Sequence, residues 1–91
     1  MKPVIPRVID ARHAGNFRIW LRFADGLTGE IDIERELWGP VFEPLKDLSE
    51  FAKLYVDAEC RTVVWPYRAD LAPEFLYEEL KTSLAAQHAA E

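Results

Sequence analysis

The segment 17–33 constrains the fold most strongly, because apolar and polar side chains alternate on both sides of a single turn. Large apolar side chains occupy one set of positions: Phe17, Ile19, Leu21, Phe23, Leu27, Ile31 and Ile33. Such a period of two residues is typical of a strand with one buried face. The segment therefore predicts a β-hairpin, and a hairpin needs further packing on its apolar face to be stable in water.

The turn Ala24-Asp25-Gly26 determines how the two strands of this hairpin pair. A two-residue loop would place Leu21 opposite Glu30 and would mix the apolar and polar faces. A three-residue loop keeps the faces separate, and its glycine adopts the left-handed conformation without strain. We therefore predict that Ile19 lies opposite Ile31.

The rest of the chain predicts a second hairpin and a long final helix. Pro73 suits the first position of that helix, because its missing N–H has no partner there anyway. Asp47 is predicted to cap a short helix that follows it. The predicted class is α+β, a small antiparallel sheet of two hairpin units with three helices. Its elements are strands at about 7–13, 17–24, 27–33, 54–57 and 62–65, with helices at about 34–38, 48–53 and 73–87.

Length and composition narrow the class of protein. The chain has 91 residues, which predicts a single domain over 1–91, with a tail at about 86–91 that frays. It has one cysteine, Cys60, so an internal disulfide framework is excluded. No apolar run approaches the roughly 20 residues that span a bilayer, and the first residues lack the apolar stretch of a signal peptide. We therefore expect a cytoplasmic protein with no membrane contact.

Charge is distributed unevenly along the chain. The formal net charge is −5, which disfavours attraction of the whole surface to nucleic acid. Residues 1–33 carry five basic and four acidic side chains, whereas residues 34–91 carry six basic and twelve acidic ones. The first hairpin is therefore the part of the chain best able to bind an anion.

The polar face of the first hairpin carries Arg18, Trp20 and Arg22. Arginine side chains can contact phosphate while an exposed aromatic ring stacks on a base, as in proteins that bind single strands. On the predicted register, however, Asp32 and Glu30 lie opposite Arg18 and Trp20 and reduce that positive field. The alternatives are an ordinary solvated face, a protein partner that covers Trp20, and nucleic acid.

A second candidate surface follows the second hairpin, with the side chains of Trp65, Tyr67, Arg68 and Asp70. These residues could line a pocket, although Asp70 is also typical of a carboxylate in a turn before a helix. Two other aromatic residues flank Gly39-Pro40 and would suit a recognition loop. We expect them to fill the core instead, since aromatic side chains bury the most area; they are Trp38 and Phe42.

Residue types that support catalysis are scarce. His13 and His88 are the only histidines, and neither has a cysteine or carboxylate at the spacing of a metal site. Cys60 has Asp57 and Arg61 as loop neighbours, which predicts an ordinary loop thiol rather than a nucleophile. We therefore predict no enzyme activity, no cofactor and no metal.

Several phrases of the sequence resemble a family of small bacterial proteins, the domain of unknown function 2442. The matching phrases are Phe23-Ala24-Asp25-Gly26, Gly39-Pro40-Val41-Phe42-Glu43-Pro44-Leu45, Thr62-Val63-Val64-Trp65-Pro66 and Ala69-Asp70-Leu71-Ala72-Pro73-Glu74-Phe75-Leu76-Tyr77. The family usually has Asn-Gly after Trp-Pro, where this chain has Tyr67-Arg68, so a different or a strained turn is predicted. The resemblance implies no assigned activity. It implies a small companion protein, sometimes fused to a helix-turn-helix or found beside a toxin-like protein.

Together these observations predict a non-enzymatic protein-binding or regulatory module, such as an antitoxin-like protein or the companion of a regulator. A protein partner or a homodimer is expected. The alternative is a nucleic-acid-binding module that uses Arg7 with the Arg18, Trp20 and Arg22 face of the first hairpin.

Overall fold

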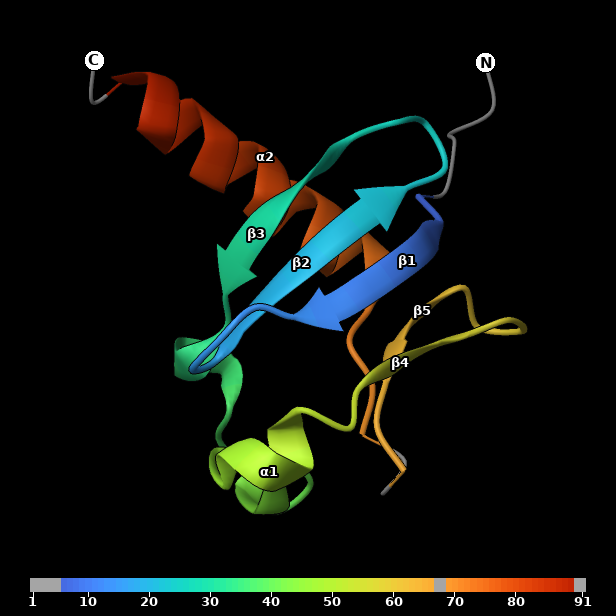
Figure 1. Cartoon of the computed structure of the whole chain (residues 1–91), viewed down its shortest axis with the longest axis vertical. Coiled ribbons are helices and arrows are strands. Elements are labelled where there is room, and N and C mark those ends of the chain that lie inside the picture. Colours follow the sequence, from blue (N-terminus) through green and yellow to red (C-terminus); the bar gives the residue numbers. More distant parts are fainter. Residues whose placement is uncertain (1–5, 67–68, 90–91) are drawn as a thin grey trace.

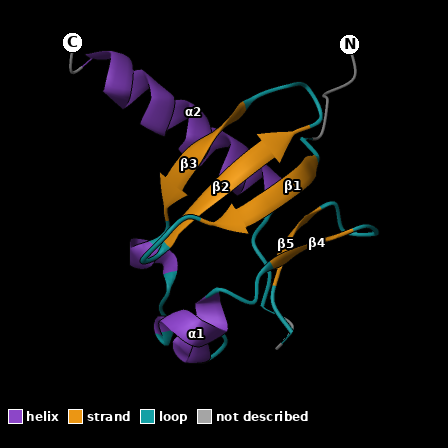
Figure 2. Cartoon of the chain, viewed as in Figure 1, coloured by secondary structure: helices purple, strands orange, loops and turns teal. Residues whose placement is uncertain are grey.

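The computed structural model describes residues 6–66 and 69–89, and within them it confirms the α+β class (Figures 1 and 2). The two hairpin units form separate antiparallel sheets, one of three strands in the order β1-β2-β3 and one of two strands. The predicted turn at Tyr67-Arg68 lies outside the described residues. The elements are β1 (Val8–His13), β2 (Arg18–Phe23), β3 (Thr28–Asp32), η1 (Glu34–Glu36), η2 (Glu43–Lys46), α1 (Leu48–Phe51), β4 (Tyr55–Asp57), β5 (Thr62–Val64) and α2 (Pro73–Ala89).

The register of the first hairpin is the predicted one. Ile19 lies opposite Ile31, as the three-residue loop requires. The backbone N–H of Phe23 donates to the carbonyl oxygen of Leu27 at 2.9 Å, which closes the loop. Gly26 has φ +96°, a conformation that glycine adopts at little cost. Local sequence therefore determines this part of the fold.

Helix α2 packs against one face of the three-stranded sheet, behind β2 and β3 in the view of Figure 1. Gly29 of β3 permits this close approach. A Cβ atom there would lie 2.7 Å from Cδ1 of Leu80, a side chain that is completely buried. The buried core, to which both sheets, α1 and α2 contribute, comprises Val8, Ile19, Leu21, Phe23, Ile31, Ile33, Leu37, Leu45, Phe51, Val63, Trp65, Ala69, Leu71, Leu76 and Leu80.

Replacing Gly29 with valine is expected to lower the free energy of unfolding by about 1–3 kcal/mol, because the new side chain overpacks the contact with Leu80. Urea denaturation measures this change. Thr28→Val is the matched control, since Thr28 is exposed and its replacement should alter stability by less than about 0.5 kcal/mol. Equal stability of the two variants would contradict the steric argument.

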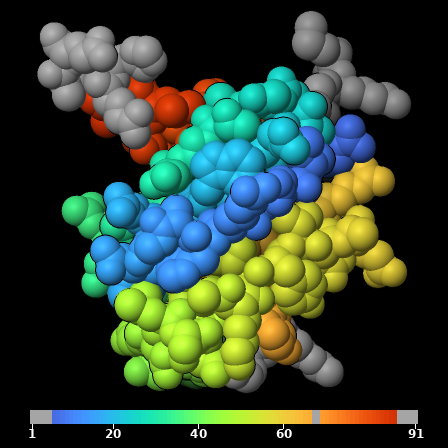
Figure 3. All heavy atoms as spheres, in the orientation of Figure 1, coloured from blue at the N-terminus to red at the C-terminus, as the bar shows by residue number. Residues whose placement is uncertain are grey.

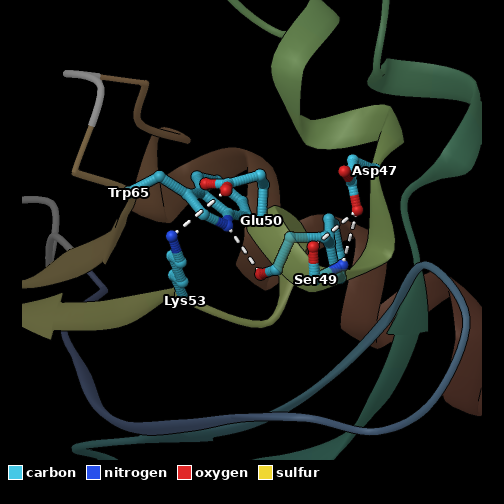
Figure 4. Close-up of polar contacts among 6 residues, drawn as sticks. Asp47, Ser49, Glu50, Lys53 and Trp65 are labelled. Atoms are coloured by element: carbon cyan, nitrogen blue, oxygen red, sulfur yellow. Dashed lines mark hydrogen bonds and ion pairs between the residues drawn. The ribbon is translucent and has the colours of Figure 1, made fainter.

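Trp65, directly after β5, joins the second sheet to α1 (Figure 4). Its side chain is 1% exposed, and its Nε1–H donates to the carbonyl oxygen of Phe51 at 2.8 Å. The predicted cap of α1 is confirmed, since the carboxylate of Asp47 accepts from the backbone N–H of Ser49 at 2.9 Å. A hydrogen bond from the backbone N–H of Val8 in β1 to the carbonyl oxygen of Arg61, just before β5, links the two sheets.

The β2–β3 turn is tied to α2 by a hydrogen bond from the Tyr77 hydroxyl to the Asp25 carboxylate. The ring of Tyr77 meets that of Phe23 edge to face, with 4.9 Å between their centroids. The bond from Tyr77, with a second from the backbone N–H of Leu27, holds the pKa of Asp25 below its ordinary value of 3.8. The same bond to Asp25 raises the pKa of Tyr77.

This bond predicts a pH dependence of stability. Because the folded pKa of Asp25 lies below its unfolded value, its carboxylate stabilises the fold above about pH 3.8, and the contribution is lost as pH falls through the folded pKa. We expect Asp25→Asn to show a shallower loss of unfolding free energy than the parent chain between about pH 5 and pH 2. Urea titrations across this range measure it, and parallel pH profiles would contradict it. Asp47 and Asp57, whose pKa values are also lowered, form a background common to both proteins.

Candidate interaction surface

The face of the three-stranded sheet opposite α2 is open, and the strands of residues 8–32 cross the surface diagonally in Figure 3. Arg18 and Arg22 are exposed on this face, as predicted, whereas Trp20 is half-buried. The guanidinium carbon of Arg12 lies 5.3 Å from the centroid of the Trp20 ring. The expectation of an exposed Trp20 is therefore corrected, because Arg12 on the neighbouring strand stacks over it.

Charges of both signs alternate across this open face. The register places Asp32 opposite Arg18, Glu30 opposite Trp20, and Asp10 opposite Arg22. With Arg12, the face carries three arginines and three carboxylates and has no net charge. The predicted register already placed Asp32 and Glu30 on this face, and the pairing with β1 adds Asp10 and Arg12. Among the described residues, the ion pair on this face joins Arg12 to Asp10 at 3.5 Å, and Arg18 and Arg22 have no such partner there.

The fold does not bring the described residues of the second candidate surface together on one exposed surface. Trp65 lies in the core, which removes its side chain from any binding surface. Tyr67 and Arg68 lie outside the described residues. Asp70 is exposed, and its backbone forms an isolated β-bridge with Val64. Of the predicted pocket residues that the structure describes, only Asp70 has a side chain available to a ligand.

The loop after η1 exposes Trp38, against the expectation that this residue fills the core. Its side chain is 72% exposed, because the preceding Leu37 occupies the core position and is 3% exposed. Phe42 meets the expectation, since it packs in part against the core. The loop turns at Gly39, where φ is +88° and open space surrounds the position of a Cβ.

Trp38 borders an open groove of about 340 Å³, called here the Trp38 groove. Leu71 and Phe75 contribute apolar surface, and Val41 on the loop is 55% exposed. Trp38 also lines a second hollow of about 420 Å³, together with Arg35. The described lining of the Trp38 groove is Glu36, Trp38, Gly39, Pro40, Val41, Phe42, Asp70, Leu71, Ala72 and Phe75.

The sequence signal nearest to this groove is the gathering of four large apolar side chains, Leu37, Trp38, Val41 and Phe42, around a Gly-Pro turn. The structure buries Leu37, packs Phe42 in part against the core, and leaves Trp38 and Val41 exposed. The pattern alone does not determine which of the four side chains face solvent.

Cys60 and His13 lie in different elements, a turn and the end of strand β1. Cys60 is exposed in the β4–β5 turn, where the charge of Asp57 raises the pKa of the thiol and keeps it protonated. The ring of His13 donates from Nε2 to the carbonyl oxygen of Asn16 at 2.7 Å and packs edge to face on Phe51. Within residues 6–66 and 69–89, no three His, Cys, Asp or Glu side chains gather as a metal site.

These features define a small α+β domain with an open, charge-balanced sheet face and an exposed aromatic loop beside an apolar groove. The described part of the chain holds no helix of the length and apolar character needed to cross a bilayer. The chain belongs to the family described as "Protein of unknown function (DUF2442)", whose sequence profile matches residues 8–82. The resemblance noted in the sequence is thus confirmed.

A comparison with curated protein sequences found no match. Among solved structures, the chain is similar to the crystal structure of a "putative DNA binding protein" from Nitrosomonas europaea, with a TM-score of 0.79 and 18% sequence identity. The aligned region covers 93% of this chain and 56% of that one, so the chain spans little more than half of its neighbour. At this identity the likeness establishes the fold alone.

Proposed function

We propose that the chain is a non-enzymatic protein-binding module and that its partner binds in the Trp38 groove. The observation that carries the proposal is the 72% exposure of Trp38 beside apolar surface. Tryptophan is the residue most enriched among those that dominate binding energy at protein interfaces. A partner that covers Trp38 and Val41 removes a large apolar area from water.

The shape of the loop also supports binding. Backbone hydrogen bonds hold both ends of the turn. The N–H of Trp38 donates to the carbonyl oxygen of Glu36 at 3.0 Å, and the N–H of Phe42 donates to that of Gly39 at 3.2 Å. Phe42 anchors the loop by packing against the core. A preformed loop loses little conformational freedom on binding, which favours affinity.

In this proposal the module works in the bacterial cytoplasm as the regulatory companion of a second protein, in the manner of an antitoxin. The test is affinity capture from the native host with the parent chain and with Trp38→Ala in parallel. A captured protein is then purified and titrated by calorimetry. We expect it to bind the parent chain and to bind the variant far more weakly. Equal binding by both, or a stable monomer that captures nothing, would refute the proposal.

A second candidate function is nucleic-acid binding by the open sheet face. It is favoured by the description of the structural neighbour as a "putative DNA binding protein" and by two exposed arginines, Arg18 and Arg22, without ion-pair partners among the described residues. Arg7, the further basic residue of the sequence prediction, is exposed next to β1.

We expect the chain to show no salt-dependent binding to oligonucleotides, because Asp10, Glu30 and Asp32 neutralise the open face. Fluorescence anisotropy at low ionic strength tests this expectation. Binding whose log–log salt slope is about −2, lost in the double variant Arg18→Gln/Arg22→Gln, would instead establish the second candidate. The control is Arg35→Gln, since Arg35 lies outside the open face.

A further inference from the structure

We infer that the segment bound in the Trp38 groove carries an apolar side chain next to a lysine or arginine. This inference rests on the proposed function and specifies the chemistry of the partner. The described lining of the groove includes two carboxylates, Glu36 and Asp70, and no basic side chain. Apolar groups from Trp38, Val41 and Phe75 form much of the remaining surface.

Both carboxylates are available to a ligand. Asp70 is exposed and Glu36 is half-buried, and neither side chain forms a hydrogen bond or an ion pair with the residues that the structure describes. A basic side chain of the partner would therefore meet two carboxylates that have no competing cation within the described lining. The same cation can lie over the Trp38 ring, where the negative face of the aromatic system attracts it.

The two hollows that Trp38 lines differ in charge, which favours one of them for a basic side chain of the partner. The Trp38 groove has an acidic lining, whereas the second hollow contains Arg35 and Lys46 together with Glu34. A bound segment that places its basic residue in the Trp38 groove avoids Arg35, which lines the second hollow. Charge complementarity of this kind determines orientation and the rate of association more than affinity.

A partner protein fits this groove better than a second copy of the chain. Two copies that each carry a net charge of −5 repel one another, whereas a basic segment is attracted to residues 34–91 with their excess of carboxylates. The volume of about 340 Å³ is at the lower end of the range for ligand pockets. We therefore expect a short segment with one or two anchoring side chains.

The test is selection from a displayed library of random peptides on the full chain, followed by anisotropy with the enriched peptides. We expect enriched peptides to pair an aliphatic or aromatic residue with Lys or Arg, and to lose affinity in Trp38→Ala. The double variant Glu36→Gln/Asp70→Asn should weaken binding about 3- to 10-fold at low salt, as loss of two partly exposed ion pairs implies. The control Glu59→Gln/Glu78→Gln removes two charges outside the groove and should leave affinity unchanged.

The outcomes separate the inference from the proposed function. Peptides that depend on Trp38 but lack a basic residue, or that bind the Glu36→Gln/Asp70→Asn variant as well as the parent chain, would overturn the inference alone. Enrichment of no Trp38-dependent peptide would overturn both. Circular dichroism and urea unfolding of each variant establish that a loss of affinity is not a loss of fold.

Discussion

Replacing Trp38 with alanine is expected to weaken partner binding by about 30-fold to 1,000-fold, the effect of removing a residue at the centre of an interface. The stability of the chain should change by less than about 0.5 kcal/mol, because the side chain is 72% exposed and contributes little to the core. Calorimetric titration with the captured partner measures the first effect, and urea denaturation measures the second.

Trp20→Ala provides the matched control for this substitution. It removes the same side chain from the open sheet face, where Trp20 is half-buried under Arg12. We expect it to leave partner affinity within about twofold of the parent chain, since Trp20 is not part of the groove lining. A larger loss of affinity in Trp20→Ala than in Trp38→Ala would show that the partner binds the open face of the sheet and not the Trp38 groove.

Replacing Trp65 with alanine is expected to produce the opposite result, a loss of about 3–5 kcal/mol in the free energy of unfolding. The side chain is 1% exposed, and its ring lies 5.6 Å from that of Phe51, centroid to centroid. Its removal leaves a cavity between the second sheet and α1. A domain of this size has a stability of only about 5–15 kcal/mol, so the variant should be close to unfolding at moderate temperature.

Trp65→Phe separates the contribution of the packed aromatic ring from that of the Nε1–H hydrogen bond. Phenylalanine keeps an aromatic ring in the core but removes the Nε1–H that donates to the carbonyl oxygen of Phe51 at 2.8 Å. That carbonyl oxygen keeps a second donor, the backbone N–H of Leu54 at 3.3 Å. We expect a stability between those of the parent chain and Trp65→Ala, with about 0.5–1.5 kcal/mol of the loss due to the missing hydrogen bond. Thermal and urea unfolding give the values. A Trp65→Ala variant as stable as the parent chain would show that the second sheet and α1 are not joined through this residue.

Elements governed by neighbouring residues were predictable from the sequence. The loop Ala24-Asp25-Gly26, the pairing of Ile19 with Ile31 and the start of α2 at Pro73 all agree with the structure. Each depends on the alternation of side chains or on the backbone preference of one residue, so the information is local. The charge balance of the open face followed from the register, because the register determines which side chains lie opposite one another.

The candidate site was less predictable, because burial depends on residues far apart in the chain. Trp38 and Trp65 are both aromatic residues followed by Gly-Pro or Pro. The sequence predicted Trp38 in the core and Trp65 on a binding surface, and the structure reverses both positions. Trp65 is buried because α1 presents the carbonyl oxygen of Phe51 to it. Trp38 is exposed because Leu37 already fills the core position beside it.

The sequence by itself thus determined the α+β class, the register of the first hairpin and the near-neutral charge of that hairpin's polar face. Only the tertiary structure decided which tryptophan is core and which is surface, and only it brought Glu36 and Asp70 to one groove. The physical reason is that alternation and turn preferences act between near neighbours, whereas burial is a competition among all apolar side chains for one small core.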